Sequence, residues 1–443
     1  MTRLKLLVIG LVGAIALFCL APAAWAFCGF YVARADTSLY NQASQVAIAR
    51  NGDRTVLTMA NDYQGEVADF AMVVPVPTVI QEDQVNVGDP AIIERLDSFS
   101  APRLVEYFDP DPCQPPVVYA PLPTSTLEDG AVNQSRGRRD AALGVTVESQ
   151  FSVGEYDILI LSARESDGLE TWLRENNYRI PDGASELLRP YIRQGMKFFV
   201  AKVNLEEFDQ GNTQKLRPLQ IAYESSRFML PIRLGMINAQ DAQDLVVYLM
   251  TPGGQAELTN YREVNIPSDA EIPVFVKNEF SDFYRDMFQT SYDREGRNVA
   301  FLEYAWNMAG CDPCSADPLS PEELRKAGVF WVNPNQFNTN VFITRLHVRY
   351  TRDKFPEDLM FQETANNQLF QGRYILRHPY EGEATCPVAE DYKQSLPDRF
   401  EQEAQTLARL TGWDINDIRD KLPNVEGDPI PWWQQLWGSL TGH

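Results

Sequence analysis

Arginine and histidine alternate in residues 344–350, where Arg345, His347 and Arg349 are spaced two apart. Because successive side chains of a β-strand point to opposite faces, a strand here would place all three on one face. Guanidinium groups bind carboxylates and phosphates through paired N–H donors, so this face could recognise an anion. The alternative is a solvated or salt-bridged face with a structural role.

Cysteine is the second residue type that could carry chemistry. Removal of an N-terminal leader would leave five cysteines, which are Cys28, Cys113, Cys311, Cys314 and Cys386. An odd number allows at most two disulfides within one chain. We expect Cys311 to pair with Cys314, or one of these to pair with Cys386, and Cys28 to pair with Cys113. Such bonds stabilise a fold by restricting the unfolded chain.

Cys311 and Cys314 also form a Cys-x-x-Cys motif, which is typical of thiol oxidoreductases. That chemistry places the first cysteine at a helix N-terminus, where the helix dipole lowers its pKa. Here the next helix start is at Ser320, beyond Pro318, so the motif favours a structural bridge. A redox role through this pair is the alternative.

No catalytic residue is assigned, because the common catalytic motifs are absent. The chain contains no Gly-x-Ser-x-Gly, His-Glu-x-x-His, Walker or Gly-x-Gly-x-x-Gly sequence. Zinc would need the Cys311/Cys314 pair plus ligands from Cys386, His347 or His378, a spacing that matches no known zinc pattern. We therefore predict neither a metal nor a cofactor. With 61 acidic residues, a carboxylate pair for a hydrolase cannot be selected from the sequence.

The first 26 residues have the composition of a secretory signal peptide. Arg3 and Lys5 precede an apolar run over residues 6–20, and Ala24 and Ala26 supply the small side chains that a signal peptidase requires. We expect cleavage between Ala26 and Phe27, which predicts a periplasmic or secreted protein with no integral membrane segment after cleavage. The alternative is retention of the apolar run as an anchor, although it is short for a span.

The mature chain would be strongly acidic, with 37 basic and 61 acidic residues and a formal charge of −24. This average charge repels nucleic acids and anionic membranes, so no nucleic-acid partner is predicted. The dense basic patch at residues 136–139 is typical of an exposed loop. Other proteins of the cell envelope are the partners that we consider.

Several segments have clear structural signals. Residues 45–50 and 55–61 alternate around the turn residues 51–53, which predicts a β-hairpin. A strand over residues 68–74 is expected to end at Pro75 because proline has no amide donor. Ser320, Pro321 and Glu323 together predict a capped helix start.

These segments predict an α+β fold with mixed, mostly antiparallel sheets, packed helices and a short helical C-terminal segment, with helices at residues 399–410 and 415–422 on either side of Gly412. The predicted divisions of the chain are a signal peptide (1–26), a β-rich unit (27–108), a Pro-rich linker or long loop (109–143), an α+β main body (144–395), the helical segment (396–422) and an aromatic tail (423–443).

Six strings of the sequence are specific enough to compare with known families. They are Cys28-Gly29-Phe30-Tyr31-Val32, Met72-Val73-Val74-Pro75-Val76-Pro77, Cys311-Asp312-Pro313-Cys314, Thr344-Arg345-Leu346-His347-Val348-Arg349-Tyr350, Phe355-Pro356-Glu357-Asp358-Leu359 and Gly372-Arg373-Tyr374-Ile375-Leu376. Together these strings resemble the uncharacterised bacterial family DUF2330. The resemblance covers most of the mature chain and implies an exported protein with cysteine pairs, without implying an activity.

The sequence therefore predicts an exported, disulfide-stapled protein that acts as a binding or envelope-associated scaffold. The competing hypothesis is an extracytoplasmic enzyme, either a thiol oxidoreductase using Cys311 and Cys314 or a hydrolase that depends on carboxylates.

Overall fold

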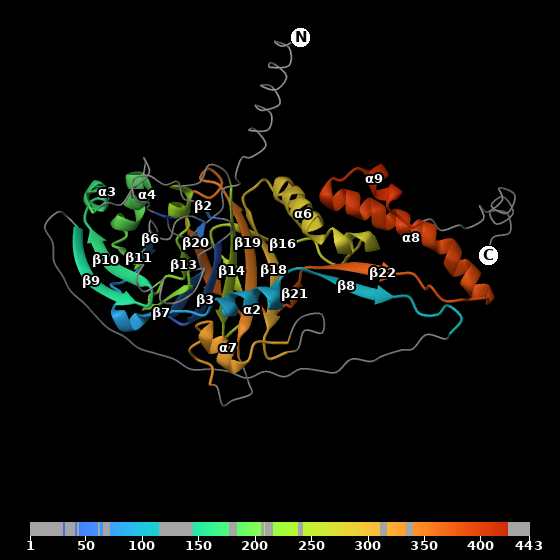
Figure 1. Ribbon diagram of the computed structural model, residues 1–443, viewed down its shortest axis with the longest axis horizontal. Coiled ribbons are helices and arrows are strands. Elements are labelled where there is room, and N and C mark those ends of the chain that lie inside the picture. The colour runs from blue at the N-terminus through green and yellow to red at the C-terminus, as the bar shows by residue number, and fades with distance from the viewer. Residues whose placement is uncertain are drawn as a thin grey trace, which may run out of the picture. The chain divides into compact units, whose positions relative to one another are not determined.

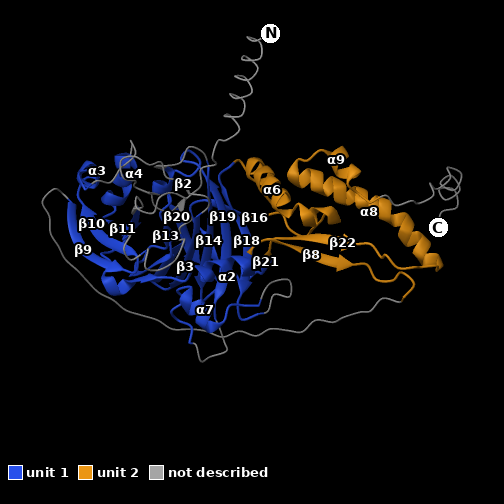
Figure 2. Cartoon of the chain, viewed as in Figure 1, with its two compact units in different colours: residues 1–100, 131–264, 297–370 blue, residues 101–130, 265–296, 371–443 orange. Residues whose placement is uncertain are grey.

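The computed structural model describes residues 30–31, 40–41, 44–60, 63–64, 71–114, 145–176, 184–204, 208, 216–237, 242–310, 317–333 and 340–423 (Figure 1). The chain forms two compact units, each assembled from separate segments (Figure 2). The first unit holds residues 1–100, 131–264 and 297–370, and the second holds residues 101–130, 265–296 and 371–443.

The described strands are β1 (Phe30–Tyr31), β2 (Tyr40–Asn41), β3 (Ser44–Asn51), β4 (Arg54–Ala60), β5 (Tyr63–Gln64), β6 (Ala71–Val76), β7 (Val85–Val87), β8 (Arg103–Phe108), β9 (Val145–Val153), β10 (Tyr156–Ala163), β11 (Lys197–Val203), β12 (Leu219–Glu224), β13 (Met229–Leu230), β14 (Gln243–Thr251), β15 (Ala256–Leu258), β16 (Arg262–Asn265), β17 (Ala270–Glu271), β18 (Val299–Asn307), β19 (Phe342–Tyr350), β20 (Leu359–Glu363), β21 (Phe370–Gln371) and β22 (Arg373–His378). The described α-helices are α2 (Pro90–Ser100), α3 (Ser166–Glu175), α4 (Ala184–Arg193), α6 (Phe280–Arg294), α7 (Pro321–Lys326), α8 (Pro387–Thr411) and α9 (Ile415–Asp420). The short 3-10 helices are η2 (Glu82–Gln84), η3 (Arg233–Ile237) and η4 (Val274–Asn278).

The first unit is built on two sheets that share one core. The five-stranded sheet has the order β1-β6-β11-β10-β9, and the nine-stranded sheet has the order β16-β18-β19-β14-β3-β4-β12-β7 with β21 also beside β18. One cluster of buried side chains joins Val74 and Phe199 of the smaller sheet with Ile48 and Leu346 of the larger one. The two sheets therefore pack face to face, as in a β-sandwich.

Helices cover the outer faces of both sheets (Figure 1). Ile92, Leu96 and Phe99 of α2 belong to a second cluster with Ala47 and Tyr248 of the nine-stranded sheet. A third cluster packs α3 and α4 against the outer face of the five-stranded sheet. The first unit thus has apolar side chains on both faces of each sheet, which explains the near-continuous burial of β3 and β14.

The predicted hairpin is confirmed, since β3 and β4 pair antiparallel around a turn in which Gly52 adopts φ +60°. The expected end of a strand at Pro75 is wrong, because β6 pairs with β11 through Pro75 and Val76. On the other side of β6, the described residues of β1 pair with Val73 and Met72. Proline is tolerated in a strand wherever the ladder needs no amide donor at its position.

The second unit combines a small parallel sheet with helices. Its strands have the order β17-β22-β8, and both pairs are parallel. Phe283 and Met287 of α6 are buried, and the ring of Phe283 lies edge-on to Tyr374 at 4.7 Å. The α+β class predicted from the sequence is confirmed by the two units together.

Two predicted helix boundaries have different outcomes. The capping box is confirmed, because Ser320 Oγ accepts from Glu323 N at 3.2 Å and Glu323 Oε2 accepts from Ser320 N at 2.7 Å. The helix expected to start at residue 399 instead starts at Pro387 and passes through Pro397 before it ends at Gly412, whose φ is +78°. No helix in the described ranges has the length and apolarity needed to cross a membrane.

Asp358 joins three elements of the first unit. Its Oδ1 accepts hydrogen bonds from the Tyr191 hydroxyl on α4 at 2.5 Å and from the amides of Ile232 and Arg233 at 3.0 and 3.3 Å. The Arg233 guanidinium lies 3.4 Å from Oδ2. Burial raises the pKa of Asp358, and these donors oppose that shift. The carboxylate therefore ties α4 and η3 to the segment that precedes β20.

We predict that Asp358→Ala lowers the free energy of unfolding by about 3–5 kcal/mol, because it leaves a partly buried cation and buried donors without their acceptor. The control is Arg352→Ala, which removes an exposed ion pair with Glu186 and should cost less than about 1 kcal/mol. Urea denaturation of the full chain measures both. Equal effects of the two variants would contradict the role given to Asp358.

Candidate functional site

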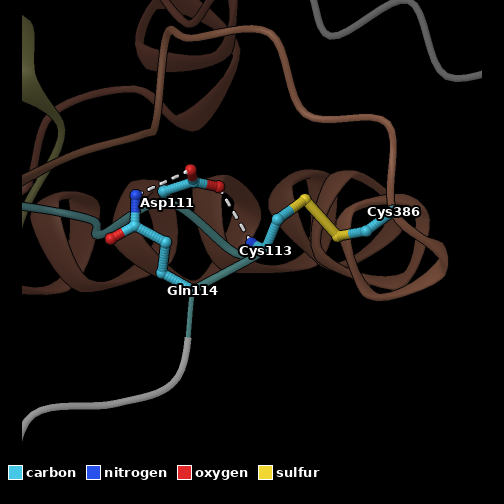
Figure 3. Close-up of a disulfide and its surroundings, with 4 residues drawn as sticks. All are labelled: Asp111, Cys113, Gln114 and Cys386. Atoms are coloured by element: carbon cyan, nitrogen blue, oxygen red, sulfur yellow. Dashed lines mark hydrogen bonds between the residues drawn. A yellow bond between two sulfur atoms is a disulfide. The ribbon is translucent and has the colours of Figure 1, made fainter.

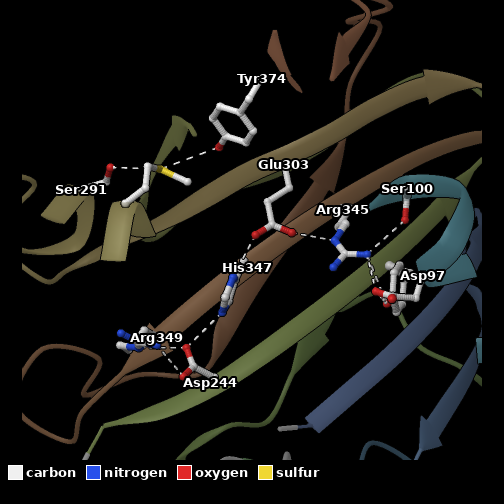
Figure 4. A network of polar contacts seen from close by, with 11 residues as sticks. Asp97, Ser100, Asp244, Ser291, Glu303, Arg345, His347, Arg349 and Tyr374 are labelled. Atoms are coloured by element: carbon white, nitrogen blue, oxygen red, sulfur yellow. Dashed lines mark hydrogen bonds and ion pairs between the residues drawn. The ribbon is translucent and has the colours of Figure 1, made fainter. Parts of the chain in front are cut away.

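Strand β19 places Arg345, His347 and Arg349 on one face of the nine-stranded sheet, as the alternation predicted. On the neighbouring strand β14, Tyr248 lies opposite Arg345 and Asp244 lies opposite Arg349. Figure 4 shows the three cationic side chains in a row with carboxylates between them. This face belongs to the first unit, and it is the site that the sequence singled out.

A β-bulge brings Glu303 between Arg345 and His347. On β18, Leu302 pairs with Leu346 and Tyr304 pairs with Arg345, so the register of the two strands shifts by one residue at Glu303. Bulges of this kind change the direction of a side chain within a sheet. Glu303 has 0% exposed surface, and its two carboxylate oxygens contact different cations.

The buried end of the row is centred on Arg345. Its Nε donates to Glu303 Oε2 at 2.6 Å, and its Nη1 donates to Asp97 Oδ1 of α2 at 2.6 Å. Asp97 also accepts from the Tyr248 hydroxyl at 2.9 Å, and the guanidinium lies over the Tyr248 ring at 5.3 Å. Arg345 therefore joins α2 to two neighbouring strands.

The other end of the row holds His347 between two carboxylates. Its Nδ1 lies 2.8 Å from Glu303 Oε1, and its Nε2 lies 3.0 Å from Asp244 Oδ1. Arg349 donates to both oxygens of Asp244, from Nε at 2.9 Å and from Nη2 at 2.8 Å. Carboxylates on both ring nitrogens require both nitrogens to carry protons, which makes the ring an imidazolium.

The pKa values of this end agree with that geometry. Burial alone would lower the pKa of His347, but the charge of Glu303 and the hydrogen bonds to both carboxylates raise it to about 9. Burial would raise the pKa of Asp244, but the hydrogen bonds and charges of His347 and Arg349 lower it to about 2. Both residues are consequently charged at neutral pH.

These pKa values define the pH range in which the row stabilises the fold. The raised pKa of His347 contributes stability that is fully present below its ordinary value of 6.5 and is lost as the pH rises through about 9. The depressed pKa of Asp244 contributes stability that is present above its ordinary value of 3.8 and is lost as the pH falls through about 2. Both contributions are complete between about pH 4 and 6.5.

The row therefore has a closed set of charges. Arg345, His347 and Arg349 are matched by the carboxylates of Asp97, Glu303 and Asp244. The structure corresponds to the salt-bridged alternative, and an anion would compete with these carboxylates for the cations. A protonated imidazole also cannot act as a general base near neutral pH.

We predict that the His347 imidazole titrates well above pH 6.5 in the folded chain, near pH 9. Glu303→Gln should lower this pKa towards or below 6.5, because the variant removes the charge that opposes desolvation. NMR titration measures it, and His378→Gln serves to assign the signals. Glu224→Gln, which removes a carboxylate paired with exposed Arg54, should leave the His347 pKa unchanged. A His347 pKa near 6.5 before substitution would contradict the closed row.

A disulfide in the second unit joins Cys113 and Cys386, with Cα atoms 5.8 Å apart (Figure 3). Asp111 shapes the turn around Cys113, since its Oδ1 accepts from Cys113 N at 2.9 Å and its Oδ2 accepts from Gln114 Nε2 at 3.2 Å. Cys386 occupies the N-cap of α8. The bond closes a loop across 273 positions of the sequence.

The expected pairing of Cys28 with Cys113 is therefore wrong, because Cys113 is bonded to Cys386. The same bond means that Cys386 does not pair with Cys311 or Cys314. The physical reason is that β8 and β22 lie side by side in the parallel sheet, which brings the segments after both strands to one end of the unit. Cys28, Cys311 and Cys314 lie outside the described residues, as do Ala24, Ala26 and Phe27 at the expected cleavage site.

Sequence reasoning missed the acidic half of the row. Asp97, Asp244 and Glu303 come from three segments that are far apart in the chain, and a helix, a strand end and a bulge bring them together. The one available signal was the position of Asp244 at the start of a long apolar strand. Within the described ranges, no group of three or more His, Cys, Asp and Glu residues could hold a metal ion.

A family model, DUF2330, described as an uncharacterized protein conserved in bacteria, matches residues 22–362. The matched range includes β19 and Cys113, whereas the string at residues 372–376, α8 and Cys386 lie beyond it. No curated protein and no solved structure matched the chain.

Proposed function

We propose that this chain, which belongs to the DUF2330 family of uncharacterised bacterial proteins, is an exported binding protein rather than an enzyme, and that a disulfide stabilises its fold. The observation that carries the proposal is the bond between Cys113 and Cys386. Disulfides persist in the periplasm and outside the cell and are rare in the cytosol. The leader that the sequence predicts to end at Ala26 supports the same compartment.

The closed row of charges favours a binding or scaffolding role over acid–base catalysis. His347 is held as an imidazolium, and each cation of the row has a carboxylate partner. Such a row stabilises the sheet and supplies no free base.

The acidic surface favours protein or small-molecule partners over nucleic acids, and other envelope proteins are the macromolecular partners that we propose.

The test is to express the full chain with its leader in a bacterium and to analyse the extracytoplasmic fraction by mass spectrometry without reduction, after rapid thiol trapping. We expect an N-terminus at Phe27 and a peptide pair that joins Cys113 to Cys386 and resists mild reductant. Replacing both cysteines with serine should lower the stability of the second unit by about 2–5 kcal/mol.

Two other outcomes would contradict the proposal. One is a chain that stays in the cytoplasm with free thiols at Cys113 and Cys386. The other is a mixture of oxidised and reduced Cys311 and Cys314 that responds to mild reductant, which would favour a thiol oxidoreductase.

A further inference from the structure

A polar cavity of about 390 Å³ lies in the second unit, between residues 268–271 and the C-terminal half of α8. Apart from one alanine, every side chain that lines it carries a polar group. Its ionisable lining residues are Asp269, Glu271, Arg399, Glu403 and Arg409. The volume lies in the range of small-molecule sites, which is about 300–1,000 Å³.

Glu403 is the unusual member of this lining. The residue is 3% exposed, yet its Oε1 has no hydrogen-bond donor among the described residues. The nearest cation is Arg399, one turn earlier on α8, whose Nε lies 3.5 Å away. Burial removes the hydration of a carboxylate oxygen, so native structures seldom leave such an oxygen without a hydrogen bond in its place.

Among the described residues, Arg399 has buried hydrogen-bond donors that lack acceptors, which complements the acceptor of Glu403 that lacks a donor. The Nη1 of Arg399 donates to Asp109 Oδ2 at 2.5 Å, but Nε and Nη2 are buried and have no acceptor in suitable geometry within the part of the chain that the structure describes. Nε and Nη2 form the edge of a guanidinium that binds a carboxylate with two parallel hydrogen bonds. Arg399 and Glu403 therefore lie close together with opposite charges but do not hydrogen-bond each other. The Nε–Nη2 edge of Arg399 remains available as a pair of donors, and Oε1 of Glu403 remains available as an acceptor.

The charges around this pair are otherwise balanced. Glu271 pairs with Arg377 at 2.8 Å, Asp269 pairs with Arg373 at 2.5 Å, and Asp109 is held by Arg399, Arg377 and the Tyr392 hydroxyl. Together with these ion-pair partners, the ionisable residues that line the cavity make up four carboxylates and four guanidinium groups. A ligand with zero net charge preserves this balance, whereas a simple anion or cation does not.

We propose that this cavity binds a small zwitterion, such as a free α-amino acid, whose carboxylate takes the free edge of Arg399 and whose ammonium group donates to Glu403. This inference deepens the proposed binding function and rests on it. On entry, the ligand carboxylate replaces Glu403 beside Arg399, and the released Glu403 accepts the ligand ammonium. One poorly aligned pair is exchanged for two charge-assisted hydrogen-bonded pairs.

The site should depend on pH in a defined direction. Burial raises the pKa of Glu403 to about 7, with the charge of Arg399 opposing that shift and the charge of Glu271 adding to it. The ammonium group needs the ionised carboxylate, so binding should release a proton and be tighter at about pH 8 than at about pH 6. A ligand that used only Arg399 would show the opposite dependence.

The experiment is isothermal titration calorimetry of the full, disulfide-intact chain, first with an equimolar mixture of the twenty α-amino acids and then with each alone. Acetate and methylamine serve as half-ligands. We expect at least one amino acid to bind, both half-ligands to bind far more weakly, and proton release to appear as a dependence of the heat on the buffer.

The variant Glu403→Gln should weaken binding about 10- to 100-fold, because a hydrogen bond between two charged groups becomes one to a neutral amide. It is isosteric and removes a buried charge, so it should fold. The matched control is Glu401→Gln, on the same helix but paired with exposed Arg419, which should leave the affinity unchanged.

Three results would overturn the inference. They are no binding of any amino acid up to about 10 mM to the folded chain, equal binding of acetate alone, and an equal loss of affinity in both variants. The proposed export and stapling would stand in each case, because they are measured independently through the N-terminus and the Cys113–Cys386 peptide.

Discussion

The burial of the Glu303 carboxylate is the constraint on which much of the first unit depends. A charge with 0% exposed surface costs several kcal/mol unless it is paired and hydrogen-bonded. The bulge in β18 directs Glu303 towards β19, and Arg345 and His347 take one oxygen each. Each of these cations then needs a second acceptor, which Asp97 and Asp244 provide. Through Asp97 and Asp244, α2 and β14 are tied to the same charged row.

The same rule separates the buried carboxylates of the two units. Asp358 and Glu303 have donors on their buried oxygens and act as structural ties between elements. Glu403 is as buried as Asp358 and lines a cavity, but one of its oxygens receives no hydrogen bond from any residue in the described ranges. A buried charge whose oxygens are all hydrogen-bonded has a structural role, because it joins elements of the fold. A buried carboxylate that lacks a hydrogen bond and lies beside a cavity suggests a ligand, and for that reason the proposed binding site is in the second unit.

The sequence predicted the structure correctly where residues close together in the chain determine it. The period of two placed Arg345, His347 and Arg349 on one face, and Ser320 and Glu323 marked a helix start. Such local rules failed at two prolines: Pro75 lies within a strand that pairs with β11, and Pro397 lies inside a long helix. The pairing of Cys113 with Cys386 depends on two parallel strands from distant parts of the chain. The carboxylates of the charged row could not be predicted for the same reason, since Asp97, Asp244 and Glu303 also come from distant parts of the chain.

The most direct test of the central claim is a double-mutant cycle between Glu303 and Arg345. The free energies of unfolding of Glu303→Gln, Arg345→Gln and the double variant are measured by urea denaturation. If the row is one closed network, the single substitutions are not additive and the coupling energy is about 2 kcal/mol or more. Additivity within about 0.5 kcal/mol would mean that the two charges act independently, and the account of the buried Glu303 carboxylate would be wrong.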